Sequence, residues 1–364
     1  MNVCIIGDGL TSLSLAKNLV KKKIAVEIYS KKKFNYSVST RTIGIAQNNL
    51  DFFKNEIIHI SDKEIWKIKK IEIFSQDLKN KILDFDMNKD LFYMIKNDKL
   101  YKKLDSHLLK DNFFKKKTIR NDDSYLKLLT NKKYDLIFNC ELDNLLSKKF
   151  FSKKIKKNYN NFSYTTILEH KKIKNDSASQ IFTKYGPIAY LPISNTATSV
   201  VFSMEIKEKK YSDKNIIDLI KSNNPKYKIK KILKLNSFKI EASSLRNYYE
   251  KNILAFGDSL HKIHPLAGQG FNMTIRDIKT ISKIIDKKIS LGLQLDSSIF
   301  EEFENITKDK NFIFCNGIDF IYEFFNFDKK TKNKNLSKAL KYLGRNKSFK
   351  NIMIKFADSG LNIL

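Results

Sequence analysis

Residues Gly257–Asp277 have the sequence GDSLHKIHPLAGQGFNMTIRD, in a chain that has only eleven glycines and four prolines. The apolar run Asn252–Phe256 precedes this segment and predicts a buried strand that ends at a Gly-Asp turn. Because α/β folds bind ligands at the carboxyl ends of their strands, the carboxylate of Asp258 is placed to accept hydrogen bonds from ligand hydroxyls. Gly268 and Gly270 then bring bare backbone close to that ligand, directly before a predicted helix.

The N-terminus predicts a second ligand-binding turn. Asn2–Ile6 and Ile24–Tyr29 are apolar and predict two strands, and apolar residues recur at helical spacing between them. In the connecting turn, Gly7 permits a tight bend and Gly9 lets the backbone approach a pyrophosphate at the helix N-terminus. Ser30 stands where dinucleotide-binding folds usually have an acid. The residues of this turn alone are equally compatible with a nucleotide site and with an ordinary strand–helix connection.

The rest of the chain predicts a mixed α/β protein with a mainly antiparallel central part. Short alternating runs between Phe150 and Ser244 predict an antiparallel sheet, and one helix near Asp213–Lys221 interrupts it. Elsewhere we predict strands at Ile71–Phe74, Ile82–Phe85 and Lys133–Cys140, and helices at Leu91–Leu109, within Ser39–Phe53 and from Ile275 almost to the end.

The net charge is +30, but the residue types argue against a nucleic-acid partner. Only five of the 69 basic residues are arginine, whereas phosphate clamps and base contacts favour the arginine fork. The lysines are spread over nearly the whole chain, which is typical of a solvated surface. We therefore expect no nucleic-acid partner, while a weaker attraction to anionic membrane surfaces stays open.

The cysteine and histidine positions predict no metal site. Cys4, Cys140 and Cys315 lie far apart and indicate buried thiols in a reducing compartment. His261 and His264 could form a metal pair, but no third ligand is near them in the sequence. No window reaches about 18 uninterrupted apolar residues, so we expect no membrane span. A strand rather than a signal peptide begins the chain, and we expect a cytoplasmic protein, at most peripheral to the inner face of the membrane.

The segment Gly257–Asp277 resembles the Gly-Asp-Ala-Ala-His…His-Pro…Gly-Gln-Gly…Asn…Asp segment of flavin-dependent aromatic hydroxylases, the group A FAD monooxygenases. It is most similar to that segment in the ubiquinone-biosynthesis hydroxylases. Thr274 departs from the family, which usually has glycine there. Further stretches follow the family's order along nearly the whole chain: Thr40–Ala46, Leu83–Phe85 with Tyr93–Asn97, Gly186–Ile193 and Gly317–Phe320.

The resemblance implies a Rossmann-like FAD-binding domain interleaved with a mainly antiparallel β-sheet substrate domain, followed by C-terminal helices. We assign 1–150 and 245–290 to the FAD-binding domain, 151–244 with part of 66–90 to the substrate domain, and 291–364 to the helical region. FAD is the implied cofactor and NAD(P)H the implied reductant. The residues expected to contact FAD are Gly7, Gly9, Leu10, Thr11, Ser12, Ser30, Arg41, Asp258, Pro265, Gly268, Gln269, Gly270, Phe271 and Asn272. Those expected to line the active site are His264, Pro265 and Pro192, and none is assigned as a catalytic group.

By the same resemblance the expected reaction is hydroxylation of an aromatic ring of a polyprenylated phenol or quinol in ubiquinone biosynthesis, with NAD(P)H and O2. Such a substrate lies in the bilayer, so peripheral membrane or multi-enzyme association would follow. Ser30, Thr274 and Leu142 depart from the family pattern; Leu142 replaces the glycine of an Ala-Asp-Gly motif in which Glu141 keeps the acid. Two alternatives therefore stay open: a non-catalytic flavin-fold scaffold or accessory protein of the same pathway, and another flavoprotein oxidoreductase.

Overall fold

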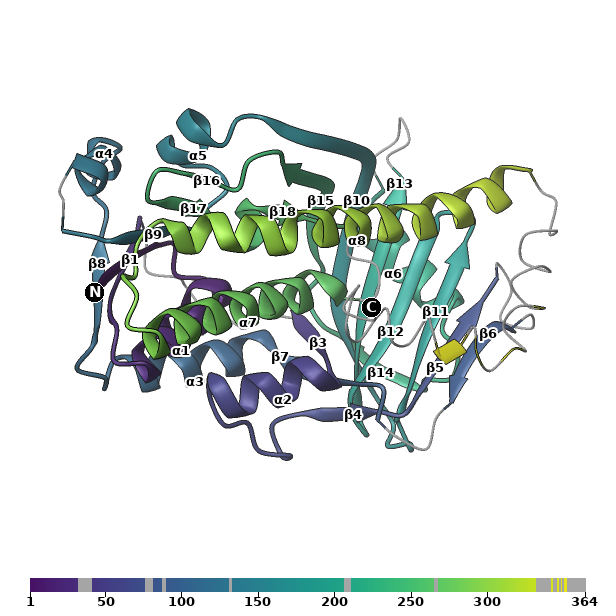
Figure 1. Cartoon of the computed structure of the whole chain (residues 1–364). Coiled ribbons are helices and arrows are strands. Elements are labelled where there is room, and N and C mark those ends of the chain that lie inside the picture. The colour runs from purple at the N-terminus through teal and green to yellow at the C-terminus, as the bar shows by residue number, and fades with distance from the viewer. Residues whose placement is uncertain are drawn as a thin grey trace.

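A computed structural model describes residues 1–31, 41–75, 81–86, 90–130, 133–205, 211–264 and 268–331, together with a few positions between 342 and 351. In Figure 1 a parallel sheet and its helices form one end of the molecule, and a larger antiparallel sheet forms the other. Helix α8 (Ser298–Thr331) extends along both. Among these residues, no helix is long and apolar enough to cross a membrane.

The first sheet has the strand order β16-β17-β9-β1-β2-β8, and all its pairs are parallel except β16 with β17. Its central strands are buried, because helices cover them and their side chains are apolar on both faces. The strands are β1 (Asn2–Ile6), β2 (Ala25–Ser30), β8 (Phe114–Thr118), β9 (Leu136–Asn139), β16 (Tyr249–Glu250) and β17 (Ile253–Ala255).

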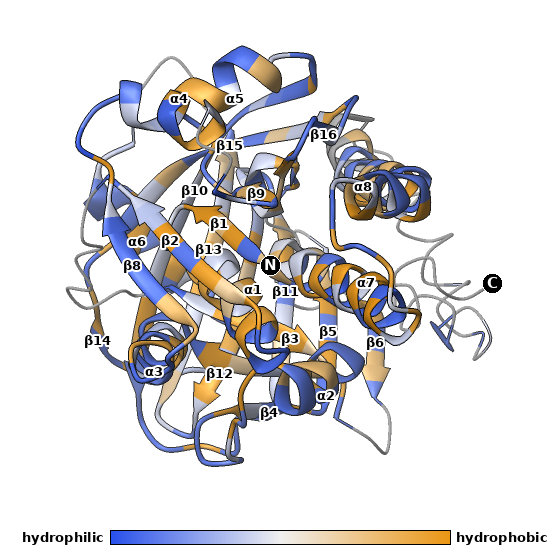
Figure 2. Ribbon diagram, turned by 60° about the vertical axis from the view of Figure 1, so that its left-hand side comes forward, coloured by the Kyte–Doolittle hydropathy of each residue, from blue (hydrophilic) through white to orange (hydrophobic). Residues whose placement is uncertain are grey.

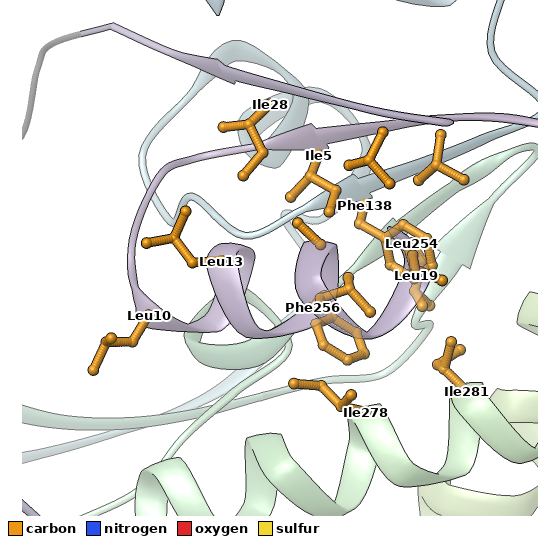
Figure 3. Packing of buried hydrophobic residues seen from close by; sticks show 14 of the residues in the cluster. Ile5, Leu10, Leu13, Leu19, Ile28, Phe138, Leu254, Phe256, Ile278 and Ile281 are labelled. Carbon is orange, nitrogen blue, oxygen red and sulfur yellow. The ribbon is translucent and has the colours of Figure 1, made fainter. Parts of the chain in front are cut away.

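Helix α1 (Leu10–Lys21) packs between this sheet and helix α7 (Gln269–Ser290). Figure 3 shows α1 between Ile5 of β1 and Ile278 of α7, with Leu13 on the side of the helix that faces the strands, and all three side chains are fully buried. Because α1 is covered on several sides, nine of its twelve residues are buried, and these include Ser12, Ser14 and Asn18. The β1–α1 turn is therefore held rigidly at the end of the sheet.

The second sheet has the order β18-β15-β10-β13-β12-β11-β5-β6, and β14 also pairs with β10. Its pairs are antiparallel except β5 with β11. Helix α6 (Asp213–Ser222) covers one face, where Ile216 packs with Tyr190. The strands are β5 (Lys70–Phe74), β6 (Lys81–Asp86), β10 (Lys154–His170), β11 (Ser177–Thr183), β12 (Gly186–Ser194), β13 (Ala197–Glu205), β14 (Ile229–Ile232), β15 (Asn236–Leu245) and β18 (His261–Lys262).

A small antiparallel sheet, in the order β3-β7-β4, lies between the two large sheets. Thr42 of β3 donates a hydrogen bond from Oγ1 to Oγ of Ser199 in β13 (2.8 Å), which joins the small sheet to the second sheet. Figure 2 shows α2, α7 and α8 with hydrophobic and hydrophilic residues, as expected for helices that cover a core on one side. The elements not yet given are β3 (Thr42–Ala46), β4 (Trp66–Ile68), β7 (Phe92–Lys96), α2 (Gln47–Glu56), α3 (Asn97–Leu108), α4 (Asp123–Thr130), α5 (Leu145–Phe150) and the 3-10 turn η1 (Gly257–Ser259).

This architecture confirms the predicted fold class, with a Rossmann-like parallel sheet interleaved with a mainly antiparallel one. The predicted helix at Leu91–Leu109 is wrong in its first part, because Phe92–Lys96 forms β7 and pairs with a strand on each side. Within Ser39–Phe53, the strand Thr42–Ala46 precedes the helix for the same reason. Each of these short strands directly precedes a helix in the sequence, and only its pairing with another strand shows that it is not the first part of that helix. The domain boundaries stay a prediction.

Candidate cofactor-binding site

A cavity of about 350 Å³ lies at the carboxyl ends of β1, β9 and β17. This is the position where open α/β sheets bind their ligands. Its lining comes from the β1–α1 turn, the starts of β3 and α3, the end of β9, η1 and the first turns of α7. The lining residues are Gly7, Asp8, Gly9, Leu10, Thr11, Ser12, Arg41, Ile43, Asn97, Tyr101, Cys140, Glu141, Asp258, Gly270, Phe271 and Thr274.

The N-terminus of α1 forms one wall of the cavity. Gly7 has φ +104°, a conformation that glycine adopts without strain. A Cβ on Gly9 would meet no atom within 4 Å, so the backbone there faces open space. No side chain of the described residues caps this helix, and its first turn has no acidic residue. Its first N–H groups and the positive end of its dipole are therefore available to an anion.

The N-terminus of α7 forms the opposite wall. Gly268 precedes the helix in the left-handed conformation, with φ +64°, and Gly270 and Phe271 line the cavity. The first turn of α7 also lacks an acid, and no side chain caps it within the described part of the chain. Two helix N-termini thus converge on one cavity, which is the arrangement that suits a ligand carrying more than one negative charge.

Asn272 holds α7 in this position. Its Oδ1 accepts hydrogen bonds from the backbone N–H of Ala46 and from Nδ2 of Asn49 (both 2.9 Å), and its Nδ2 donates to the carbonyl of Gly44 (2.9 Å). The side chain is buried, so these bonds replace water that it cannot reach. Asn272 therefore connects α7 to β3 and α2. It was predicted to contact FAD, but it is not among the lining residues.

Asp258 reaches the cavity because of the turn that carries it. Gly257 has φ +63°, and a Cβ built on it would lie 2.6 Å from Cγ2 of Thr11. Only glycine fits there, since both the backbone conformation and the close approach of α1 exclude a side chain. The turn thereby packs the end of β17 closely against α1 and places Asp258 in the cavity lining.

The charges in the cavity are mostly negative. Asp8, Glu141 and Asp258 contribute carboxyl groups, and Arg41 is the basic residue in the lining. Burial raises the pKa of Glu141, and the nearby Asp8 carboxylate raises it further. The hydroxyl of Tyr125 donates to Oε2 of Glu141 (3.0 Å) and opposes this shift by stabilising the ionised form. Burial also raises the pKa of the Cys140 thiol, to about 12.

Neither Ser30, which stands where dinucleotide-binding folds usually have an acid, nor Glu27 in the same strand lines the cavity. Ser30 ends β2 but does not line the cavity described above. Glu27 points to the other side, where it forms ion pairs with Lys117 (2.8 Å) and Lys133 (2.7 Å). These lysines and the hydroxyl of Tyr134 lower the pKa of Glu27 to about 2, although partial burial opposes them. Glu27 therefore stabilises the sheet edge.

His261 and His264 do not form a metal pair. His261 bonds through Nε2 to Oδ2 of Asp277 (2.5 Å), and both side chains are buried. The His264 ring stacks on Tyr322 at 4.3 Å between centroids. Burial, assisted by the charge of Lys157, lowers the pKa of His264 to about 3, and it stays neutral at ordinary pH. No group of metal-ligating side chains exists among the described residues.

The predicted site residues divide into three groups. Gly7, Gly9, Leu10, Thr11, Ser12, Arg41, Asp258, Gly270 and Phe271 line the cavity together. Ser30, Gly268, Gln269, Asn272, His264 and Pro192 lie outside its lining, and Pro265 lies outside the described residues. Pro192 is buried in β12, which has neighbours on both sides, so it is not an edge-strand proline. Direct contact between any of these residues and a cofactor stays a prediction.

Sequence reasoning did not assign several lining residues: Asp8, Ile43, Asn97, Tyr101, Cys140, Glu141 and Thr274. Asp8 lies between two glycines already chosen, so the turn itself was a sufficient signal. Cys140 and Glu141 directly follow a predicted buried strand. Their proximity to Gly7 depends on β9 pairing with β1, which no local pattern reveals.

The residues present fit FAD, the cofactor that the sequence resemblance implies. The free N–H groups of α1 and α7, the open backbone at Gly9 and Gly270 and the charge of Arg41 suit a diphosphate. The Asp258 carboxylate suits ligand hydroxyls. Asp8 and Glu141 are the unfavourable members, because carboxylates repel phosphate oxygens.

The model of a protein family described as an FAD binding domain matches residues 152–290. Among curated proteins, the mitochondrial ubiquinone biosynthesis monooxygenase COQ6 of Dictyostelium discoideum is 26% identical over 183 residues, covering 40% of this chain and 37% of that protein. The 3-demethoxyubiquinol 3-hydroxylase of Escherichia coli is 27% identical over 157 residues, covering 41% of this chain and 40% of that protein. The chain thus matches less than half the length of either relative.

Solved structures share the fold over nearly the whole chain. The p-nitrophenol 4-monooxygenase PnpA of Pseudomonas putida superposes with a TM-score of 0.77 at 10% identity, covering 100% of this chain and 98% of that one. HpxO of Klebsiella pneumoniae, complexed with FAD and uric acid, gives a TM-score of 0.74 at 12% identity, covering 99% and 97%. The chain therefore shares the fold of these solved structures, and residues 152–290 are similar to an FAD binding domain.

Proposed function

We propose that the chain is an FAD-dependent monooxygenase that hydroxylates an aromatic ring of a polyprenylated phenol or quinol in ubiquinone biosynthesis, with NAD(P)H and O2. The observation that carries the proposal is the cavity between the N-termini of α1 and α7, lined by both glycine turns and by Arg41. The names of the curated relatives support this substrate class, and the names of the solved structures are compatible with ring chemistry.

Different residues of the cavity would bind different parts of the cofactor. The N–H groups of α1 and the Arg41 guanidinium would bind the diphosphate, and Asp258 would accept hydrogen bonds from hydroxyls. Gly270 leaves room for a flat ring beside the start of α7, whose dipole favours negative charge there. When bound, the flavin supplies the redox chemistry with NAD(P)H and O2. The protein then supplies position and water exclusion.

The first experiment tests cofactor binding and turnover. Purified protein mixed with FAD should retain a visible flavin absorption band, and NAD(P)H oxidation should rise when a demethylated quinone precursor is added. The product should have gained one oxygen atom. A protein that stays colourless after reconstitution would exclude the proposed enzyme.

A charge variant tests the location of the cofactor. Arg41→Gln should weaken FAD binding roughly tenfold, because a charge-assisted contact to phosphate is lost. Arg120→Gln removes a charge from an exposed residue outside the cavity and serves as the matched control. Titrations followed by flavin fluorescence measure both. Equal affinity in the two variants would place the diphosphate elsewhere.

A non-catalytic scaffold is the second candidate. Asp8 favours it, because it adds a second carboxyl group, beside the acid that the family keeps at Glu141, to the cavity that should receive a diphosphate. Binding of FAD without substrate-dependent NAD(P)H oxidation would support this candidate over the enzyme.

We also propose that the protein associates peripherally with anionic membranes, where a polyprenylated substrate would lie. The support is the net charge of +30 and a row of exposed apolar side chains on the outer face of α8. These side chains are spaced seven residues apart, so each lies only about 20° around the helix axis from the one before it. They are Ile306, Ile313, Phe320 and Phe327, exposed by 40%, 54%, 69% and 59%.

Vesicle flotation tests this association. The protein should float with vesicles that contain anionic phosphatidylglycerol, and added salt should weaken the interaction. The double variant Phe320→Ser with Phe327→Ser should float less. Leu109→Ser removes an exposed leucine at the end of α3 and is the control. If the double variant floats like the wild type, α8 is not the contact surface.

A further inference from the structure

Glu141 lies directly against the glycine turn of the cavity. It follows β9, whose neighbour β1 ends at Gly7, and its Cγ lies 3.1 Å from the position that a Cβ on Gly7 would occupy. Its carboxyl group therefore sits over the backbone that α/β folds use to approach a diphosphate. The backbone carbonyl of Glu141 accepts from Oγ of Ser147 (2.7 Å), which fixes this placement.

Charged and titratable groups face Glu141 from every element around it. Tyr125 of α4 donates to Oε2 (3.0 Å), and Asn144 at the start of α5 favours the ionised form of the carboxyl group. Lys31 lies beyond the end of β2 and favours the ionised form, whereas Asp8 of the β1–α1 turn opposes it. Cys140, Asp258, Arg41 and Tyr101 complete the titratable lining. Burial and the Asp8 carboxylate raise the pKa of Glu141 by more than the polar neighbours and Lys31 lower it, so the net shift is upward.

A diphosphate beside Glu141 would add a stronger repulsion than Asp8 alone. The cavity is only about 350 Å³, so the anion and the carboxylate cannot move far apart. The hydrogen bond from Tyr125 also holds the side chain in place. Repulsion between like charges at short range favours the neutral acid, and a proton from solvent removes the charge without moving the side chain.

We propose that binding of FAD in this cavity is coupled to uptake of one proton by Glu141. The inference rests on the FAD binding proposed above and adds a pH dependence to it. The proton comes from solvent and bonds to a carboxylate oxygen of Glu141, so the site gains one positive charge while it receives the diphosphate.

The sign of the effect follows from linkage. FAD should bind most tightly below the pKa that Glu141 has in the free protein. Above that pKa, affinity should fall with rising pH by up to about tenfold per unit, because each binding event must take up one proton. The fall should level off above the pKa that Glu141 has in the complex. His264 does not titrate in this window, since its pKa is about 3.

The test is a series of FAD titrations, followed by flavin fluorescence, from about pH 5 to pH 9. Glu141→Gln keeps the size of the side chain and cannot ionise, so its affinity should be independent of pH and equal to the low-pH affinity of the wild type. Glu302→Gln removes an acid from α8, far along the chain from the cavity, and should keep the wild-type slope. Calorimetry in two buffers of different ionisation enthalpy counts the protons directly.

Two further variants test the neighbours without touching Glu141. Asp8→Asn removes a repelling charge, lowers the pKa of Glu141 and should move the fall in affinity to lower pH. Tyr125→Phe removes a donor to the ionised carboxylate and should move it to higher pH. These shifts keep the inference testable if Glu141→Gln does not fold.

Each result has a distinct meaning. Wild-type protein that binds FAD with equal affinity at all pH values overturns the coupling but leaves the proposed function intact. A slope that persists in Glu141→Gln assigns the proton to another group and also overturns the inference. Failure to bind FAD at any pH overturns both proposals.

Discussion

At the scale of single residues, the junction between β17 and α1 depends on one glycine. Gly257 combines φ +63° with a close approach to Thr11. Asp258, the next residue, lines the cavity. The same glycine was prominent in the sequence, but its contact partner lies near the other end of the chain.

We expect Gly257→Ala to destabilise the protein by about 1–3 kcal/mol, since the new Cβ is strained by φ and clashes with Cγ2 of Thr11. Urea unfolding measures the change. Thr11→Ala in the same chain should recover part of the loss, because it removes the clash but not the backbone strain. Full stability of Gly257→Ala alone would contradict the geometry of the turn.

At the scale of elements, an ion network joins the edge strand β8 to β2. Glu27 of β2 pairs with Lys117 of β8 and with Lys133, which precedes β9. The pKa of Glu27 is lowered to about 2, so the ionised form stabilises the folded protein. This contribution is fully present above the unfolded pKa, near 4.5, and is lost as the pH falls towards 2.

Glu27→Gln should therefore lower the free energy of unfolding at pH 7. The difference from the wild type should become smaller as the pH decreases below about 4.5. Denaturant unfolding at several pH values measures the difference between the variant and the wild type. Glu302→Gln, on an exposed pair with Lys287, should show little difference at any pH. A pH-independent loss in Glu27→Gln would point to packing as the cause.

At the scale of the whole molecule, we expect the two large sheets to unfold as one cooperative unit. The chain crosses between them repeatedly, and α8 contacts β16 of the first sheet and, through Asp319, Tyr159 of β10 in the second sheet. Trp66 in β4, the single tryptophan, donates from Nε1 to the carbonyl of Asn175 (2.6 Å), which lies just before β11. Trp66 therefore reports on the contact between the small sheet and the second sheet.

We expect thermal unfolding to show one transition, with the same midpoint by tryptophan fluorescence and by far-ultraviolet circular dichroism. Saturating FAD should raise both midpoints equally, because a ligand that binds the native state stabilises the whole cooperative unit. Two separated midpoints, with only one raised by FAD, would mean that the second sheet unfolds independently of the cofactor cavity.

Hydrophobic periodicity and turn signals in the sequence were sufficient to predict much of the fold. The first βαβ unit, the central antiparallel strands and the long C-terminal helices follow from periodicity, and two glycine turns located most of the cavity wall. The short strands β3 and β7 were hidden, because five residues beside a helix do not reveal a partner strand. Asn272 was expected at the cofactor, but its hydrogen bonds to Gly44 and Ala46 make it an anchor between elements.

The sequence by itself determined the class of the fold and the two turns that form the cavity, since glycine and helix-start signals act over a few residues. Only the tertiary structure decided which charges surround those turns. Glu141 lies next to Gly7 because β9 pairs with β1, although the two residues are 134 positions apart in the sequence. His264 lies outside the cavity lining, where its ring stacks on Tyr322. Electrostatic energy depends on distance in space and on burial, and neither can be obtained from spacing along the chain.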